Sequence, residues 1–354
     1  MNTKKHTPKV AIIVPVYDVA DYIESCLSSI LSQTYQDFEL ILVNDCSPDK
    51  RDREICLKFE EKDARVTFLE LVQNSGSGGA RNAGIKVTQA EYILFVDSDD
   101  EIEEDMVEKL FHLAQKYKTD LTVCEYFDLD KERSMDNNYT YSSQKKSSLE
   151  YLLPFSKGKA RVSYAPWGKL WRRSLFIDND IFFPIGIRHQ DMATIPRLLH
   201  FVEKLFYTDV QLYRYRTREG SAVNSLPKFK EYFIIFDLLL TFIKDANIYN
   251  EYRARFYNEF IYQQTLYIIK RLKKYEHDNT LYRLKLRELF SCFVKHKILF
   301  SFLNALSLKH ALKLLYFSAG VESNHIKSWN SLWVLPLGGI HLILRSLKVY
   351  KVLN

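Results

Sequence analysis

The stretch EYILFVDSDD, residues 91–100, contains a short apolar run that ends abruptly in acidic residues. Residues 92–96 are apolar or aromatic throughout, which predicts a strand buried on both faces, as in a parallel sheet covered by helices. Asp97, Asp99 and Asp100 follow at its carboxyl end. Because open α/β sheets bind ligands outside the carboxyl ends of their strands, this stretch predicts the class of fold and the place of its site.

The same alternation of strand and helix extends outward from this stretch over the first hundred residues. Further strands are expected at residues 10–14, 40–43 and 66–69, and helices at 23–31, 49–62 and 78–85. This order predicts an α/β fold with a mostly parallel central sheet flanked by helices.

From about residue 228 the pattern becomes helical, which predicts an α-helical C-terminal region. We therefore expect three parts, at residues 1–127, 128–227 and 228–354.

The acidic residues after the strand have two interpretations. Asp97 and Asp99 lie two positions apart, so both carboxylates could face one Mn²⁺ or Mg²⁺ ion, which prefers oxygen ligands. Asp99, Asp100 and Glu101 could instead cap a helix that begins near Glu103, since acidic residues are favoured at helix N-termini. The cluster by itself does not separate a metal site from a helix cap.

Four strings occur in order along the first hundred residues. They are VAIIVPVYD (10–18), FELILVNDCSPD (38–49), NSGSGGARNAGI (74–85) and EYILFVDSDD (91–100). Their order and spacing resemble those of the family 2 glycosyltransferases that have a GT-A fold and assemble bacterial polysaccharides. The resemblance covers roughly residues 8–110, weakens through 160–221 and is absent after about 228.

The resemblance implies a UDP-sugar donor and assigns roles to residues of these strings. Asp45 would hydrogen-bond the uracil or ribose, as a carboxylate acceptor can. Arg81 would either reach a phosphate or brace the acidic cluster from behind. Asp97 would contact the ribose or the metal, and Asp99 the metal. The other residues implied at the nucleotide-sugar site are Pro15, Val16, Tyr17, Gly79 and Ser98.

One departure from the family pattern affects the local geometry. The family often has glycine where Cys46 stands. If that position needs a positive φ, the cysteine costs about 1 kcal/mol or more.

An inverting transfer is a single displacement at the anomeric carbon, so a base must take the proton of the attacking hydroxyl. The family often carries Glu-Asp after an aromatic-Pro-x-Gly stretch, and here Gln190-Asp191 follows Phe183-Pro184-Ile185-Gly186. The resemblance therefore implies Asp191 as the general base. Asp191 could also be the N-cap of a helix over 192–201, and His189 is a rival base by residue type.

Residues of the acceptor side are expected in two further strings. Trp167 in WGKLW (167–171) could stack on a sugar ring, although two tryptophans in a strand are more often core residues. Arg214, Arg216 and Arg218 alternate, so they would share one face of a strand. Arg216 is a candidate for the diphosphate, and a solvated strand face is the alternative.

Charge is unevenly distributed along the chain. Residues 1–229 carry 31 Lys and Arg against 35 Asp and Glu, whereas residues 230–354 carry 19 against 9. A basic C-terminal third predicts an anionic partner or simply a solvated helix face. Aromatic residues near Lys270 and Arg271 favour a membrane surface. In the absence of nucleic-acid-binding motifs, no nucleic acid partner is expected.

The five cysteines are scattered and form no CxxC pair, which is typical of a reducing compartment. The apolar run at 10–16 is too short for a good signal sequence. We therefore expect a cytoplasmic protein, peripheral on the inner face of the plasma membrane, with a lipid-linked glycan acceptor.

The predicted function is the metal-assisted inverting transfer of a hexosyl or N-acetylhexosaminyl group from a UDP-sugar to a cell-surface or capsular polysaccharide intermediate. The alternative is a catalytically inactive GT-A module that binds a sugar or a partner.

Overall fold

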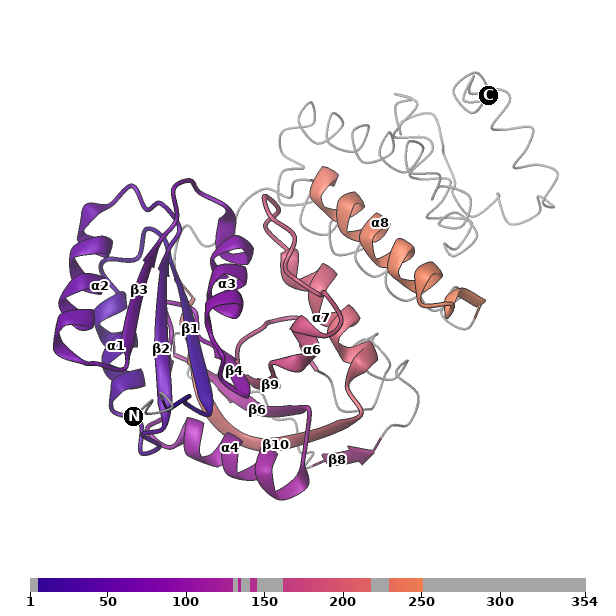
Figure 1. Ribbon diagram of the computed structural model, residues 1–354, viewed down its shortest axis with the longest axis horizontal. Helices are drawn as coiled ribbons and strands as arrows, with labels where there is room; N and C mark the ends of the chain where they lie inside the picture. Colours follow the sequence, from indigo (N-terminus) through magenta and orange to yellow (C-terminus); the bar gives the residue numbers. More distant parts are fainter. Residues whose placement is uncertain (1–5, 130–132, 135–140, 145–161, 218–228, 251–354) are drawn as a thin grey trace, which may run out of the picture. The chain divides into compact units, whose positions relative to one another are not determined.

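The computed structural model describes residues 6–129, 133–134, 141–144, 162–217 and 229–250 (Figure 1). The chain divides into two compact units, residues 1–224 and 225–354, which are described separately. The predicted separation of the first unit into halves at residue 127 stays a prediction.

The N-terminal part of the sheet is parallel, as the apolar runs predict. Its four strands lie in the order β3-β2-β1-β4 and pair in parallel. They are β1 (Val10–Val16), β2 (Phe38–Asn44), β3 (Val66–Glu70) and β4 (Tyr92–Phe95). Every residue of β1 is buried, because helices cover both faces of the sheet.

The remainder of the sheet is mixed. Beyond β4 the order continues β9-β6-β10-β5, with β9 antiparallel to both β4 and β6 and β10 parallel to β6. These strands are β5 (Glu101–Ile102), β6 (Leu121–Asp128), β9 (Lys169–Arg172) and β10 (Lys204–Tyr215). Two short strands, β7 (Arg133–Ser134) and β8 (Tyr141–Gln144), pair with β6 and β10 and complete the ten described strands. The parallel arrangement is thus confined mainly to β1–β4.

Helices pack on both faces of this sheet. The helices on one face are α1 (Ile23–Leu31), α2 (Lys50–Lys62) and α4 (Met106–Tyr117), and those on the other are α3 (Gly76–Val87), α6 (Ser174–Ile177) and α7 (Gln190–Phe201). Neighbouring residues of β1 show the division, since Ile12 packs into the first core and Ile13 into the second. Figure 1 shows α1 and α2 on one side of β1–β3 and α3 on the other.

The predicted start of the helix that follows the acidic residues is wrong. The helix expected near Glu103 begins at Met106, because Glu101–Ile102 form β5 and pair antiparallel with Tyr213 and Arg214 of β10. Asp99 and Asp100 therefore precede a strand and do not cap α4. The residue before α4 is Asp105.

In the second unit the structure describes α8 (Phe229–Asp245), which agrees with the predicted helical pattern. Within the described part of the chain, no helix is both long and apolar enough to cross a membrane. The predicted basic membrane-binding surface lies mostly beyond residue 250, outside the described residues.

Candidate active site

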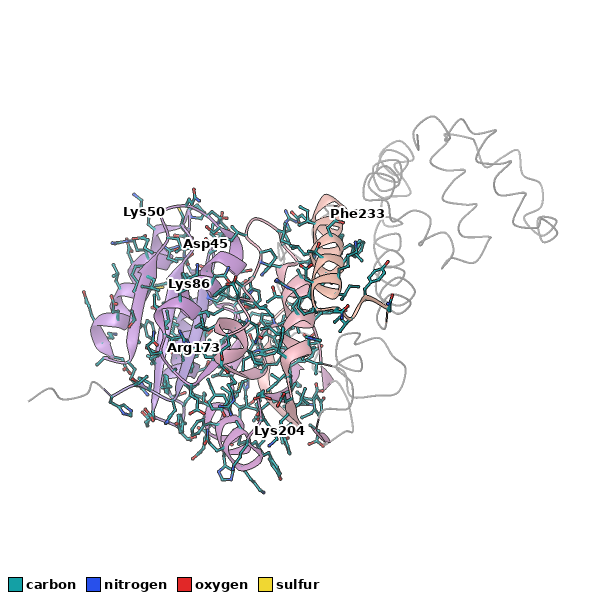
Figure 2. The ribbon with its side chains drawn as sticks, turned by 45° about the vertical axis from the view of Figure 1, so that its right-hand side comes forward. Asp45, Lys50, Lys86, Arg173, Lys204 and Phe233 are labelled. Carbon is teal, nitrogen blue, oxygen red and sulfur yellow. The ribbon has the colours of Figure 1, made fainter. Side chains whose placement is uncertain are left out.

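The carboxyl ends of β1, β2 and β4 meet at one edge of the sheet, since these strands are parallel neighbours. This edge brings together Tyr17, Asp45 and Asp97. Figure 2 shows Asp45 near the upper edge of the first unit and Lys204, the first residue of β10, near the lower edge. Tyr17 is 44% exposed, while Asp45 is buried. Pro15 and Val16 are buried within β1.

Asp45 ties the end of β2 to the start of α3. Its Oδ1 accepts a hydrogen bond from Ser75 N at 2.7 Å, and its main-chain oxygen accepts one from Asn74 Nδ2 at 3.2 Å. Burial raises the pKa of its carboxyl, although the backbone N–H groups of Ser75 and Gly76 oppose that rise. The expected contact of Asp45 with a uracil or ribose stays a prediction.

The position after Asp45 does adopt a positive φ. Cys46 has φ of 56°, so the chain carries a cysteine where a glycine would be less strained. The expected cost of about 1 kcal/mol therefore applies.

A buried carboxylate that the sequence reasoning missed holds two loops of this edge together. Asp52 of α2 accepts hydrogen bonds from Val19 N at 3.2 Å and from Ser47 Oγ at 2.6 Å. Ser47 Oγ accepts one from Asp18 N at 3.0 Å. Asp52 thus joins the loop after β1 to the loop after β2. No local signal distinguishes it from the other acids of a polar helix.

Two glycines at the start of α3 are required by packing. A Cβ on Gly79 would lie 2.3 Å from Ser75 Cβ, and a Cβ on Gly78 would lie 2.8 Å from Gln190 Cγ. The second contact is with α7, so Gly78 allows α3 and α7 to approach closely. Passage of a nucleotide beside Gly79 stays a prediction.

Arg81 braces the acidic cluster. Its side chain is 4% exposed, and Nη2 lies 2.5 Å from Asp97 Oδ1. Of the two predicted roles for Arg81, this geometry favours the brace over the phosphate contact. The pair also partly neutralises the carboxylates that gather at this edge.

Asp100 holds the acidic loop (residues 97–101) from within. Its Oδ2 accepts a hydrogen bond from the Tyr213 hydroxyl at 2.6 Å, and its Oδ1 accepts one from Arg216 N at 2.8 Å. Burial raises the pKa of Asp100 to about 9, and the charges of Asp97 and Asp99 add to the rise.

Arg216 lies just after β10 and contacts the same loop from outside. Its Nε donates to Asp99 O at 3.2 Å, and its Nη2 pairs with Glu101 Oε1 at 2.8 Å. The structure therefore places Arg216 as a support of the acidic loop, and its contact with a diphosphate stays a prediction. Ser98 is buried in this loop. Arg218 lies outside the described residues.

An aromatic stack connects the expected acceptor side to the acidic loop. Trp167 stacks on Tyr213 with ring centroids 4.5 Å apart and on Tyr215 at 5.4 Å. The Tyr213 hydroxyl also accepts a hydrogen bond from Asp97 N at 3.1 Å. Trp171, by contrast, is fully buried in the core, as the alternative for this string predicts.

Asp191 lies in the first turn of α7 and is not its N-cap. The helix begins at Gln190, with His189 as the preceding residue, and Asp191 Oδ1 accepts a hydrogen bond from Met192 N at 2.9 Å. The N-cap interpretation is therefore wrong, because the helix starts two residues earlier than expected.

The surroundings of Asp191 tune its acidity. Burial raises the pKa of its carboxyl to about 6, the charge of Arg81 opposes the rise, and Asp97 adds to it. At neutral pH such a carboxylate is ionised yet able to accept a proton, which suits a general base. Arg81 thus acts electrostatically on both Asp97 and Asp191.

Gln190 fixes the first turn of α7 against α3. With the side-chain amide oriented to satisfy both ends, Oε1 accepts from Ser77 Oγ at 2.7 Å and from Arg81 Nη1 at 2.8 Å. In this orientation Nε2 donates to the carbonyl oxygens of Ile187, at 3.0 Å, and Arg188. The neutral amide therefore lies between the residue that braces the acidic cluster and the turn that carries Asp191.

The residues present fit a divalent ion that is shared with a substrate. Among the described residues, no group of three or more His, Cys, Asp or Glu side chains is arranged to hold a metal. Asp97 and Asp99 still offer carboxylate oxygens at one loop. Mg²⁺ is commonly held by one or two carboxylates together with substrate phosphates, so these two aspartates suffice only if a diphosphate completes the shell.

The family model and the relatives that match this chain are all described as glycosyltransferases. The family model described as "Glycosyl transferase family 2" matches residues 11–179. Glycosyltransferase GlyA of Streptococcus pneumoniae serotype 4 is 36% identical over 60% of this chain, but the match spans only 31% of GlyA. GlyG of the same organism is 34% identical over 61% of this chain and 73% of its own length. The putative glycosyltransferase EpsH of Bacillus subtilis is 32% identical over 70% of this chain and 72% of its own length.

A solved structure shares the fold. Residues 1–349 of S. aureus TarS in complex with UDP-GlcNAc align with a TM-score of 0.69, covering 88% of this chain and 87% of that one. The sequence identity is 20%, so this likeness supports the architecture alone.

Proposed function

The chain belongs to glycosyltransferase family 2, and from that premise we propose that it transfers a sugar from a UDP-sugar to a glycan acceptor with inversion at the anomeric carbon. The observation that carries the proposal is the position of Asp191. Its carboxyl, with a pKa of about 6, shares Arg81 with Asp97 of the acidic loop. The proposed base, Asp191, and the proposed site of the departing diphosphate, near Asp97, would then both lie near the Arg81 guanidinium.

The donor site is proposed at the edge formed by β1, β2 and β4. Tyr17 would contact the base, and Asp45 the uracil or ribose. TarS, which shares the fold, has been solved with UDP-GlcNAc and with UDP, which supports a UDP-sugar as the donor. Asp52 holds together the loops that follow β1 and β2, so the proposed donor site would need little reorganisation on binding.

Asp97 and Asp99 would hold Mn²⁺ or Mg²⁺ against the diphosphate. When bound, the ion would neutralise negative charge on the departing diphosphate. Arg81 and the Asp100–Tyr213 hydrogen bond keep the acidic loop in place, which spares reorganisation during the reaction.

Asp191 would accept the proton of the acceptor hydroxyl as that oxygen attacks the anomeric carbon. General base catalysis contributes about 10²- to 10⁴-fold in rate. With a pKa of about 6, the Asp191 carboxyl is ionised in most molecules at pH 7, so it can accept a proton without first losing one. His189, the residue before α7, is proposed as a neighbouring contact of the acceptor.

The acceptor is proposed to be a cell-surface or capsular polysaccharide intermediate, with Trp167 as a stacking surface for a sugar ring. Relatives support this class by name: one is a poly(ribitol-phosphate) beta-glucosyltransferase of Bacillus spizizenii, and another a putative teichuronic acid biosynthesis glycosyltransferase of B. subtilis. The transferred group is proposed to be a hexosyl or N-acetylhexosaminyl group, and the acceptor to be lipid-linked on the cytoplasmic leaflet. Failure of the purified protein to sediment with anionic liposomes at low salt would remove the membrane part of this proposal.

The test is hydrolysis of a panel of UDP-sugars with Mn²⁺, by the parent and by the Asp191→Asn variant. The parent should release UDP from at least one donor. The variant should lose this turnover and still bind UDP with nearly the same affinity. Equal turnover of parent and variant would remove Asp191 from the mechanism.

A further inference from the structure

Lys169 is a buried cation that the proposed reaction does not use. It lies in β9 and is 2% exposed. An ammonium group that is removed from water loses much of its hydration free energy unless hydrogen bonds replace it. Burial lowers the pKa of Lys169 to about 8, while the charges of Glu125 and Asp191 and the Cys124 thiol oppose that decrease.

The three N–H donors of Lys169 all go to one short segment of the chain, residues 163–167. Nζ donates to Ser163 Oγ at 2.9 Å, to Ala165 O at 2.8 Å and to Trp167 O at 3.3 Å. An ammonium has three donors, so these partners account for all of them. Gly168 has φ of +68°, and this left-handed turn connects the segment to β9. The segment therefore wraps around the ammonium group.

The same segment borders the candidate site at two places. Burial raises the pKa of the Tyr164 hydroxyl, and the charge of the neighbouring Asp191 carboxylate adds to the rise. At the other end, Trp167 stacks on Tyr213, whose hydroxyl contacts Asp97 N and Asp100. Residues 163–167 thus extend from the neighbourhood of the proposed base to that of the acidic loop.

We propose that Lys169 is a positioning residue, which holds residues 163–167 as the wall of the acceptor side between Asp191 and the acidic loop. This inference rests on the proposed function, because residues 163–167 border an acceptor site only if the chain carries out the proposed transfer. Lys169 touches no reacting atom in this account. It acts through the backbone of the segment, so it should affect the step that needs Asp191 and spare donor binding.

The test compares Lys169→Met, which keeps the length of the side chain and removes its donors, with Val10→Ala. Val10 is the first residue of β1 and is fully buried at the end of that strand opposite the candidate site, so it controls for general destabilisation. Three quantities are measured on the full chain: UDP affinity with Mn²⁺ by calorimetry, the rate of UDP-sugar hydrolysis, and amide hydrogen exchange over residues 162–168. The donor is whichever sugar nucleotide of the panel the parent hydrolyses fastest.

Lys169→Met should lower the hydrolysis rate about tenfold or more, because small displacements of a site reduce rates strongly. Its UDP affinity should change less than about twofold, and hydrogen exchange should accelerate in the 162–168 segment. Val10→Ala should lower the melting temperature and leave the rate per folded molecule and the exchange of this segment near the parent values. If Lys169→Met keeps the parent rate, or loses rate and UDP affinity by the same factor, the proposal is wrong.

Ser163→Ala keeps the test decisive if Lys169→Met does not fold. It removes one acceptor of the ammonium at an exposed residue, so the chain should fold normally. It should produce a smaller decrease in rate, again without loss of UDP affinity, and an unchanged rate and unchanged exchange would overturn the proposal. A parent that binds and hydrolyses no UDP-sugar would instead contradict the proposed function, before any variant is compared.

Discussion

Replacing Asp191 with asparagine should stabilise the fold at the same time as it removes turnover. The reason is that burial raises the pKa of the Asp191 carboxyl from the usual 3.8 to about 6. The ionised carboxylate is therefore less favourable in the folded chain than in the unfolded chain. Asparagine has nearly the same shape, can accept the hydrogen bond from Met192 N, and carries no charge to desolvate.

The magnitude follows from linkage between protonation and folding. A folded-state pKa above the unfolded one lowers the free energy of unfolding as pH rises through the interval, here from about 4 to 6. Above about pH 6 the raised pKa lowers the free energy of unfolding by its full amount, about 3 kcal/mol, and at pH 5 it lowers it by about half as much. The advantage of the asparagine variant should therefore grow with pH and level off above about pH 7.

Thermal melts of parent and variant at pH 5 and pH 8 measure this difference. We expect the variant to melt higher at both values, with a gain at pH 8 of about 5 to 10 °C and roughly half of that at pH 5. A variant that melts lower than the parent at pH 8, or gains equally at the two pH values, would refute the reasoning. The gain would then not come from the buried charge.

Three further predictions concern the groups around Asp191 and the acidic loop. Arg81→Met removes the charge that lowers the pKa of Asp191, so that pKa should rise by about one unit. The rate of UDP-sugar hydrolysis should then fall about fivefold more at pH 6 than at pH 8, and Arg81→Lys should show less of this pH dependence. Equal losses of rate at both pH values would contradict this role of Arg81. Asp99→Ala should weaken UDP binding about tenfold or more in Mn²⁺ and little in EDTA, as measured by calorimetry, whereas a parent that binds UDP equally well in EDTA would exclude the metal role. Tyr213→Phe removes the hydroxyl that donates to Asp100, so it should lower the free energy of unfolding by about 1–3 kcal/mol. It should also weaken Mn²⁺-dependent UDP binding. Unchanged UDP affinity would show that this hydroxyl does not hold the acidic loop.

The N-terminal part of the fold was predictable because its information is local. The strands β1 and β4 are apolar or aromatic along their whole length, and β2 contains the apolar run at residues 40–43. Asp49 caps the start of α2. The short strand Glu101–Ile102 was not predictable, since two acid-flanked residues resemble the start of a helix. Only pairing with β10, more than 100 residues later, makes them a strand.

The candidate site was likewise predictable only where its residues follow a local pattern. Its strand-end aspartates were visible in the sequence, because acids after buried strands are unusual. Their supports were not, since Asp52, Tyr213 and Lys169 act through contacts between elements that are far apart or through loops with no periodic pattern. The start of α7 was also misplaced, because Gln190 is held by partners on α3 and not by a local capping signal.

The central claim is a single displacement at the anomeric carbon, with Asp191 as the base. Its most direct test is proton NMR of the sugar released when the parent hydrolyses an α-linked UDP-sugar in the presence of Mn²⁺, recorded before the anomers equilibrate. The account predicts that the β-anomer appears first, with water in the place of the acceptor. First appearance of the α-anomer would contradict the claim.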